Sequence, residues 1–126
     1  MTDFKNIKNL AKLFRLAKTN LWLAKQEENI PLFEQADKMY LEAQHALQTA
    51  EAHRTKIILV ETTNDDTYSF FENEDVFYSN FEEGRLEVVS FTTGEIYISS
   101  PAKCRKVDKG VSTIKTKNSL LVAIDL

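Results

Sequence analysis

Apolar residues recur every three to four positions over residues 1–54, which is the spacing of one face of an α-helix. The stretch is interrupted at residues 29–31, Asn-Ile-Pro, because proline lacks an amide donor and disfavours helix in the preceding residue. One helix is therefore predicted to end near Glu28 and a second to end near His53. Their short link predicts an antiparallel helical hairpin. The apolar positions are Ile7, Leu10, Phe14, Ala17, Leu21 and Ala24, then Phe33, Ala36, Tyr40, Ala43, Leu47 and Ala50.

From residue 55 the pattern changes to short apolar or alternating runs separated by turn residues, which predicts β-strands. The first strand is the β-branched run at 56–60, and all three glycines fall in later turns. Further strands are expected at about 67–72, 75–80, 85–92, 95–99, 102–107, 111–116 and 119–125. Strands this short and evenly spaced predict an antiparallel barrel or sandwich of about six to eight strands.

The predicted fold class is therefore α+β, with a helical hairpin over 1–54 and an antiparallel β-domain over 55–126. The boundary has no linker composition, so we expect the two parts to be rigidly joined. A two-helix hairpin cannot bury its apolar stripes alone. It must pack on the β-domain, on a second hairpin or on another protein.

Charge is strongly segregated along the chain, although the net charge of the 126 residues is only −3. The local net charge is +5 over 1–25, −5 over 26–51, +2 over 52–60, −8 over 61–87 and +3 over 88–126. A basic helix is thus expected beside an acidic one, and the early β-strands are expected to form an acidic surface. No apolar run is long enough to cross a membrane, and the single cysteine fits a reducing compartment. We expect a cytoplasmic protein.

The first helix is apolar over more of its circumference than a one-sided helix needs. Leu13 and Leu16 share an angular sector with Leu23, and Trp22 is typical of an interface anchor. These four residues predict contact with another protein or with a second copy, as a dimer that forms a four-helix bundle. The alternative is that both faces of the helix are buried within one monomer.

The acidic block over 61–87 is the predicted electrostatic contact surface, through Asp65, Asp66, Glu74 and Asp75. Dense carboxylates can attract a basic or nucleic-acid-binding protein. The alternative places the acids in hairpin loops and the interleaved aromatic residues in the core. The order of the acids does not match a calcium-binding EF-hand loop.

A basic stripe on the first helix, Lys5, Lys8, Lys12 and Arg15, could follow a phosphate backbone or could simply be a solvated face. A second basic group has the same two interpretations. It consists of Lys103, Arg105, Lys106 and Lys109.

Catalytic chemistry has little support in the sequence. The chain has two histidines and none of the common nucleotide-binding, zinc-protease or hydrolase motifs. Cys104 with either histidine could form a nucleophile and base, but no neighbouring residue supports the pairing. We therefore expect no catalytic residues, no cofactor and no metal.

The sequence favours a non-enzymatic interaction module, a small inhibitor or adaptor of the kind found in phages and mobile elements. It would bind another protein through its helices and its acidic β-surface, form a homo-oligomer and have no contact with a membrane. The alternatives are a nucleic-acid-binding protein that uses the basic stripe with the β-domain, and an enzyme of unknown class.

Overall fold

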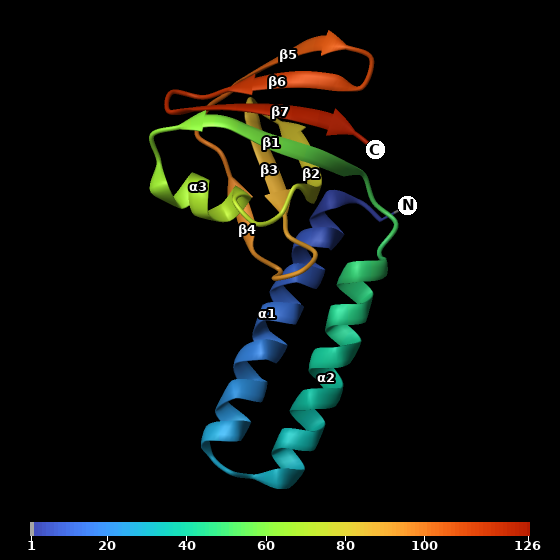
Figure 1. Ribbon diagram of the computed structural model, residues 1–126. Helices are drawn as coiled ribbons and strands as arrows, with labels where there is room; N and C mark the ends of the chain where they lie inside the picture. Colours follow the sequence, from blue (N-terminus) through green and yellow to red (C-terminus); the bar gives the residue numbers. More distant parts are fainter. Residues whose placement is uncertain (1) are drawn as a thin grey trace. The chain divides into compact units, whose positions relative to one another are not determined.

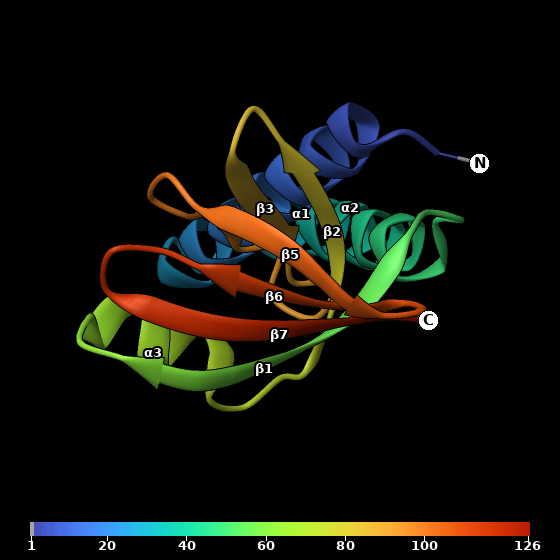
Figure 2. The ribbon, with the colours of Figure 1, turned by 90° about the horizontal axis from the view of Figure 1, so that it is seen from above.

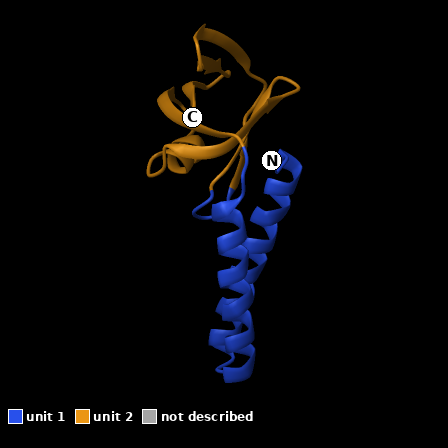
Figure 3. Ribbon diagram, turned by 90° about the vertical axis from the view of Figure 1, so that its right-hand side faces the viewer, with its two compact units in different colours: residues 1–52, 91–95 blue, residues 53–90, 96–126 orange. Residues whose placement is uncertain are grey.

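The computed structural model describes residues 2–126 and has two compact units, which we describe separately (Figures 1 and 3). One unit consists of residues 1–52 and 91–95, and the other of residues 53–90 and 96–126. Two N-terminal helices are followed by an antiparallel sheet of seven strands. The predicted α+β class, with a helical hairpin and an antiparallel sheet, is confirmed.

The hairpin consists of α1 (Phe4–Gln26) and α2 (Ile30–Thr49). Each helix begins at a short polar side chain that caps it. The Asp3 carboxylate accepts a hydrogen bond from the amide of Asn6 at 2.9 Å, and the Asn29 side chain accepts one from Leu32 at 3.1 Å. Both caps occupy the first orphan amides of their helices, so the helix starts follow from local sequence.

Two contacts cover the face of α1 that carries Ala11 and Phe14. The Phe14 ring packs against Tyr40 of α2, with 5.3 Å between the ring centroids. The segment 91–95 packs closely on the same helix at Gly94. A Cβ added to this glycine would lie only 2.9 Å from the Phe14 ring and 3.1 Å from the carbonyl oxygen of Ala11. A third sector of α1 remains exposed.

The seven strands form one sheet in the order β4-β3-β2-β1-β7-β6-β5, and every pair is antiparallel. The strands β4 and β5 are the two ends of this order, so the sheet is open rather than a closed barrel. The central strand β1 pairs with β7 along most of its length and with β2 only through its first residues. The bounds are β1 Arg54–Thr62, β2 Val76–Glu82, β3 Arg85–Val89, β4 Ile96–Ile98, β5 Lys103–Asp108, β6 Val111–Lys115 and β7 Ser119–Asp125.

One predicted strand is wrong, because residues 65–71 form the helix α3 (Asp65–Phe71) instead of a strand at 67–72. The Asn64 side chain accepts a hydrogen bond from the amide of Thr67 at 3.0 Å, so Asn64 is the N-cap. Asp65 and Asp66 stand in the first turn, where carboxylates interact favourably with the helix dipole. The sequence Asn64-Asp65-Asp66 thus starts a helix.

The core of the sheet unit combines aliphatic residues of the strands with aromatic residues of α3. Ile57, Phe77, Val88 and Leu121 are almost fully buried in it. The rings of Phe70, Phe71, Phe77 and Tyr97 form a cluster with centroid distances of 5.0–5.4 Å. Most of the aromatic residues in the acidic block are therefore core residues, as the alternative interpretation of that block expected.

Within residues 2–126, no helix combines the length and the hydropathy that crossing a membrane requires.

Candidate functional site

The most prominent surface feature of the helical unit is an apolar groove between α1 and α2. It consists of two adjoining hollows of about 290 and 340 Å³, and Asn20 and Met39 border both of them. We call this feature the interhelical groove. It is lined by Leu10, Leu13, Leu16, Ala17, Asn20, Leu23 and Glu27 from α1 and its C-cap, and by Leu32, Gln35, Ala36, Met39, Glu42, Ala43 and Ala46 from α2.

Three of the four residues predicted to make an apolar contact lie in the interhelical groove. Leu13 and Leu16 border the first hollow and are 58% and 56% exposed, and Leu23 borders the second. The leucine side chains project at one edge of the groove, and the alanines Ala43 and Ala46 form its floor. The predicted common sector of these leucines therefore coincides with an apolar surface that the described chain leaves uncovered.

Trp22 does not line the interhelical groove. It is nine residues after Leu13, about two and a half helical turns, and therefore projects from the opposite side of α1. It is 59% exposed. Trp22 therefore stays a separate candidate for apolar contact, on another side of α1 than the three leucines.

The contribution of α2 to the groove was missed in part. Ala36 and Ala43 belong to the predicted apolar stripe of this helix, whereas Leu32, Met39 and Ala46, which also line the groove, do not. The groove side of α2 is thus the edge of the predicted stripe together with three residues that the spacing did not single out.

The four acidic candidates divide into two pairs. Asp65 and Asp66 are exposed in the first turn of α3. Glu74 accepts a hydrogen bond from the Ser90 hydroxyl at 2.6 Å, and Asp75 pairs with Lys56 at 3.7 Å. Asp65, Asp66 and Asp75 are thus exposed, and Asp75 differs from the other two by its basic neighbour.

The basic stripe of α1 is not a uniform row of solvated cations. Lys5, Lys12 and Arg15 are exposed, whereas Lys8 is half-buried with its ammonium 5.8 Å from the Phe4 ring centre. The stem of Arg15 also lies beside Gly94, where a built Cβ would be 3.3 Å from Arg15 Cγ. Part of the stripe thus packs within its own unit.

A second, more polar hollow of about 270 Å³ lies on the concave side of the sheet, and we call it the sheet hollow. The sheet is strongly curled (Figure 2). Residues of β1, β2, β3, β5, β6 and β7 line the hollow. Its lining is His53, Thr55, Ser79, Asn80, Phe81, Leu86, Cys104, Ser112, Ile114, Ala123 and Asp125.

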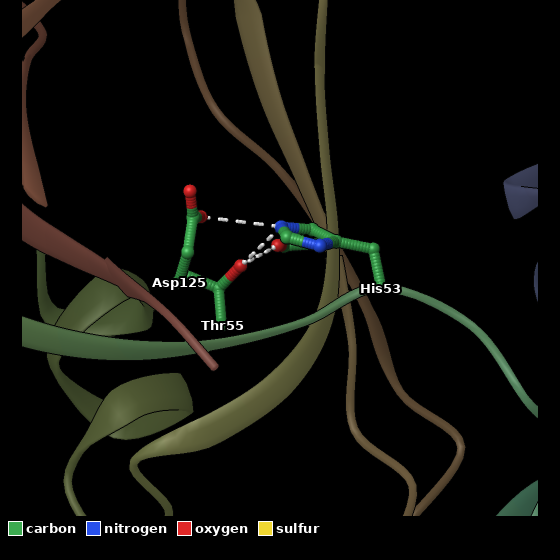
Figure 4. Close-up of polar contacts among 4 residues, drawn as sticks. His53, Thr55 and Asp125 are labelled. Atoms are coloured by element: carbon green, nitrogen blue, oxygen red, sulfur yellow. Dashed lines mark hydrogen bonds and ion pairs between the residues drawn. The ribbon is translucent and has the colours of Figure 1, made fainter. Parts of the chain in front are cut away.

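A chain of polar contacts runs along one wall of the sheet hollow (Figure 4). Nε2 of His53 lies 3.2 Å from a carboxylate oxygen of Asp125 and 3.1 Å from the hydroxyl of Thr55. The Thr55 hydroxyl in turn makes a hydrogen bond with that of Ser79, and both residues are buried. These contacts connect the start of β1 with the end of β7 and with β2.

This arrangement differs from a nucleophile–histidine–acid relay. In such a relay the nucleophile and the acid contact opposite ring nitrogens. Here the hydroxyl and the carboxylate meet the same nitrogen of His53, and more than half of the side-chain surface of both His53 and Asp125 is exposed. The geometry is that of an exposed histidine–carboxylate contact in which a hydroxyl meets the same ring nitrogen.

Cys104 is exposed on β5 and shares the sheet hollow with His53. Among residues 2–126, the thiol makes no hydrogen bond with either histidine. Within the same range, no three His, Cys, Asp or Glu side chains are grouped so as to hold a metal ion.

No protein-family model, no curated protein and no solved structure matches this chain.

Proposed function

We propose that this chain is a protein-interaction module that self-associates through the interhelical groove. The observation that supports this most strongly is the groove itself, an exposed apolar surface with Leu13, Leu16 and Leu23 on one helix and Met39 on the other. Large exposed apolar surfaces on small proteins commonly mark sites of association. The occupant that we propose is the hairpin of a second copy, which gives a two-fold symmetric four-helix bundle.

Shape favours a second copy as the occupant. The groove offers projecting leucines on α1 and a floor of small residues, Ala43 and Ala46, on α2. In a two-fold arrangement, each surface meets its own copy, so the ridge of one hairpin can enter the floor of the other. Leucine knobs between facing helices are the usual packing of four-helix bundles.

Charge favours the same occupant. α1 carries six basic side chains and no acidic one, whereas α2 carries three acids and one lysine. Glu42 lines the apolar groove, and within residues 2–126 it takes part in no ion pair. Lys12 precedes Leu16 by four residues and therefore stands on the same face of α1. When the hairpin of a second copy covers the groove, Lys12 of that copy would come close to Glu42.

The exposed acids at the start of α3 are the proposed contact with a partner protein. Asp65 and Asp66 would attract a basic partner protein to the dimer, which is the role of an adaptor or inhibitor. The free and exposed thiol of Cys104 is suited to a reducing compartment, and we propose a cytoplasmic location.

The test is the molar mass in solution, measured by light scattering from low to high micromolar concentration. We expect a dimer that dissociates on dilution, and a monomer at all concentrations for Leu13→Asp combined with Leu16→Asp. Leu41→Asp is the matched control, since Leu41 is 53% exposed on α2 but does not line the groove. A native chain that stays monomeric throughout would overturn the proposal.

A charge exchange identifies the occupant. Glu42→Lys should weaken the dimer, and adding Lys12→Glu should restore it, because each then meets its opposite charge on the second copy. Failure of the second change to restore the dimer would contradict the proposed arrangement. Steeply salt-dependent binding of RNA or DNA to the monomer, lost with Lys5→Glu and Lys12→Glu, would instead favour the nucleic-acid alternative.

A further inference from the structure

Two lysines stand directly opposite each other on the hairpin formed by β5 and β6. The strand register pairs Lys103 with Lys115, so both side chains project from the same face of the sheet. Residues opposite each other in antiparallel strands have Cβ atoms about 5 Å apart, and like charges at such positions are destabilising. The repulsion between the two ammonium groups therefore lowers the stability of the sheet, and the pairing of the strands does not require lysine at either position.

A third lysine is held close to this pair by a rigid turn. The amides of Asn118 and Ser119 donate to the hydroxyl of the buried Thr116 at 3.3 and 2.9 Å, and the Thr116 amide donates to the Ser119 carbonyl at 2.9 Å. These bonds define the path of the backbone on both sides of Lys117. The turn thus presents Lys117 from a backbone that its own hydrogen bonds hold in place.

The three lysines border one hollow of about 510 Å³, which we call the lysine hollow. None of its lining residues is acidic, and within residues 2–126 none of the three lysines takes part in an ion pair. The nearest acidic residue by strand register is Glu61, which borders an adjoining hollow with Lys115 and Lys117 but makes no ion pair with them. The lining residues are Pro101, Ala102, Lys103, Lys115, Thr116 and Lys117.

We propose that the lysine hollow binds a compact anion that carries two or more phosphate groups. Three ammonium groups around one space attract a ligand with several negative charges, and ammonium groups bind phosphate oxygens as point charges. A ligand of this kind would also remove the repulsion between Lys103 and Lys115. The proposal is independent of the interhelical groove and of self-association.

The probe is inorganic diphosphate, titrated calorimetrically into the full chain at about 10 mM salt, where screening is weak and the Debye length is about 30 Å. We expect saturable binding, with each of Lys103→Gln, Lys115→Gln and Lys117→Gln reducing the affinity about tenfold. In amide-resolved NMR, the shifts should centre on Thr116 and Asn118. Lys106→Gln is the matched control, because Lys106 is on the same strand but projects from the opposite face.

Two further titrations identify the source of the phosphate. A nucleoside diphosphate should bind if the ligand is soluble, and vesicles that contain a doubly phosphorylated inositol lipid should bind if it is a headgroup; either result supports a compact phosphate site. Absence of diphosphate binding at low salt would overturn the proposal. It would also be overturned if Lys106→Gln weakened binding as much as the three hollow variants, or if a single-stranded oligonucleotide bound and diphosphate did not.

Discussion

Gly94 lies against the ring of Phe14, and a Cβ built on this glycine would come within 2.9 Å of Phe14 Cδ2. The same atom would lie 3.1 Å from the carbonyl oxygen of Ala11 on α1. The segment 91–95 approaches the helix so closely only because residue 94 has no side chain. The backbone at Gly94 has a φ of +75°, a conformation that favours glycine independently of this contact.

Gly94→Ala should therefore destabilise the protein for two reasons. The left-handed backbone costs about 1–2 kcal/mol for a residue with a Cβ, and the clash with Phe14 and Ala11 adds about 1–3 kcal/mol of overpacking. Urea unfolding followed by circular dichroism measures the total. Gly110→Ala is the matched control, since Gly110 has a similar φ of +71° but its added Cβ would meet nothing closer than 3.8 Å. Equal losses for the two variants would show that the contact with Phe14 has no energetic weight.

The Thr55–Ser79 hydrogen bond predicts a non-additive pair of mutations. Thr55→Val leaves the buried Ser79 hydroxyl without this partner and should cost about 1–3 kcal/mol. Ser79→Ala in the Thr55→Val background should recover part of the loss, because both polar groups are then absent. Chemical unfolding of the two single variants and the double variant completes the cycle. A double variant as unstable as the sum of the single ones would contradict the coupling.

The contact between His53 and Asp125, which adjoins the Thr55–Ser79 bond, should contribute little to the free energy of unfolding. Both side chains are more than half exposed, and exposed ion pairs contribute about 0–1 kcal/mol. Asp125→Asn should therefore change the free energy of unfolding by less than Thr55→Val does. A larger loss from Asp125→Asn would mean that this exposed contact with β7 contributes more to stability than the buried Thr55–Ser79 bond between β1 and β2.

Asn64 should be required for α3. Asn64→Ala removes the side-chain oxygen that accepts from the Thr67 amide and should cost about 0.5–2 kcal/mol. Asn64→Asp keeps an acceptor at the same position and should leave the stability nearly unchanged. Hydrogen exchange at the amides of Thr67 and Tyr68 reports the local effect. Unaltered exchange in Asn64→Ala would indicate that α3 is held by its aromatic packing alone.

Lys103→Glu should increase the stability of the chain while it removes a charge from the lysine hollow. The change replaces a like-charged cross-strand pair with an opposite-charged one, which is favourable by about 0.2–1 kcal/mol. The free energy of unfolding measured without phosphate should therefore rise. Lys106→Glu, opposite Ser112, provides the comparison without a facing lysine. A loss of stability in Lys103→Glu would mean that Lys103 and Lys115 do not repel each other appreciably.

Trp22 distinguishes between two sides of α1 as the surface of association. It is the single tryptophan of the chain, and it projects from the side opposite Leu13. If the second copy covers the interhelical groove, fluorescence quenching of Trp22 by acrylamide should be the same in the dimer and the monomer. Protection of Trp22 in the dimer would instead favour the sequence-based prediction that this residue is the anchor.

The helices and the sheet class could be predicted because their signals are local. Asp3 and Asn29 cap the helices with their own side chains, and the spacing of Ile7, Phe14 and Ala17 marks the buried face directly. The failure at α3 has a local cause as well. Phe70 and Phe71 resemble strand residues, and the cap signal of Asn64 is also a common turn signal.

The site residues were only partly predictable. Leu13, Leu16 and Leu23 could be grouped from helical geometry, whereas Ala43 and Ala46 carry too little hydrophobicity to mark a groove. The contact partners of Glu74 and Asp75 could not be predicted from the sequence, since Ser90 and Lys56 approach them only in the folded chain.

By itself the sequence determined the helical hairpin, the antiparallel strands and the segregation of charge, because spacing, capping and turn chemistry act between residues that are close along the chain. Tertiary structure alone decided that Lys103 faces Lys115, that Gly94 meets Phe14 and that His53 meets Asp125. These pairs depend on strand register and on the path of the connecting segments. A one-residue change of register would turn either lysine to the other face of the sheet, and no local pattern distinguishes the two registers.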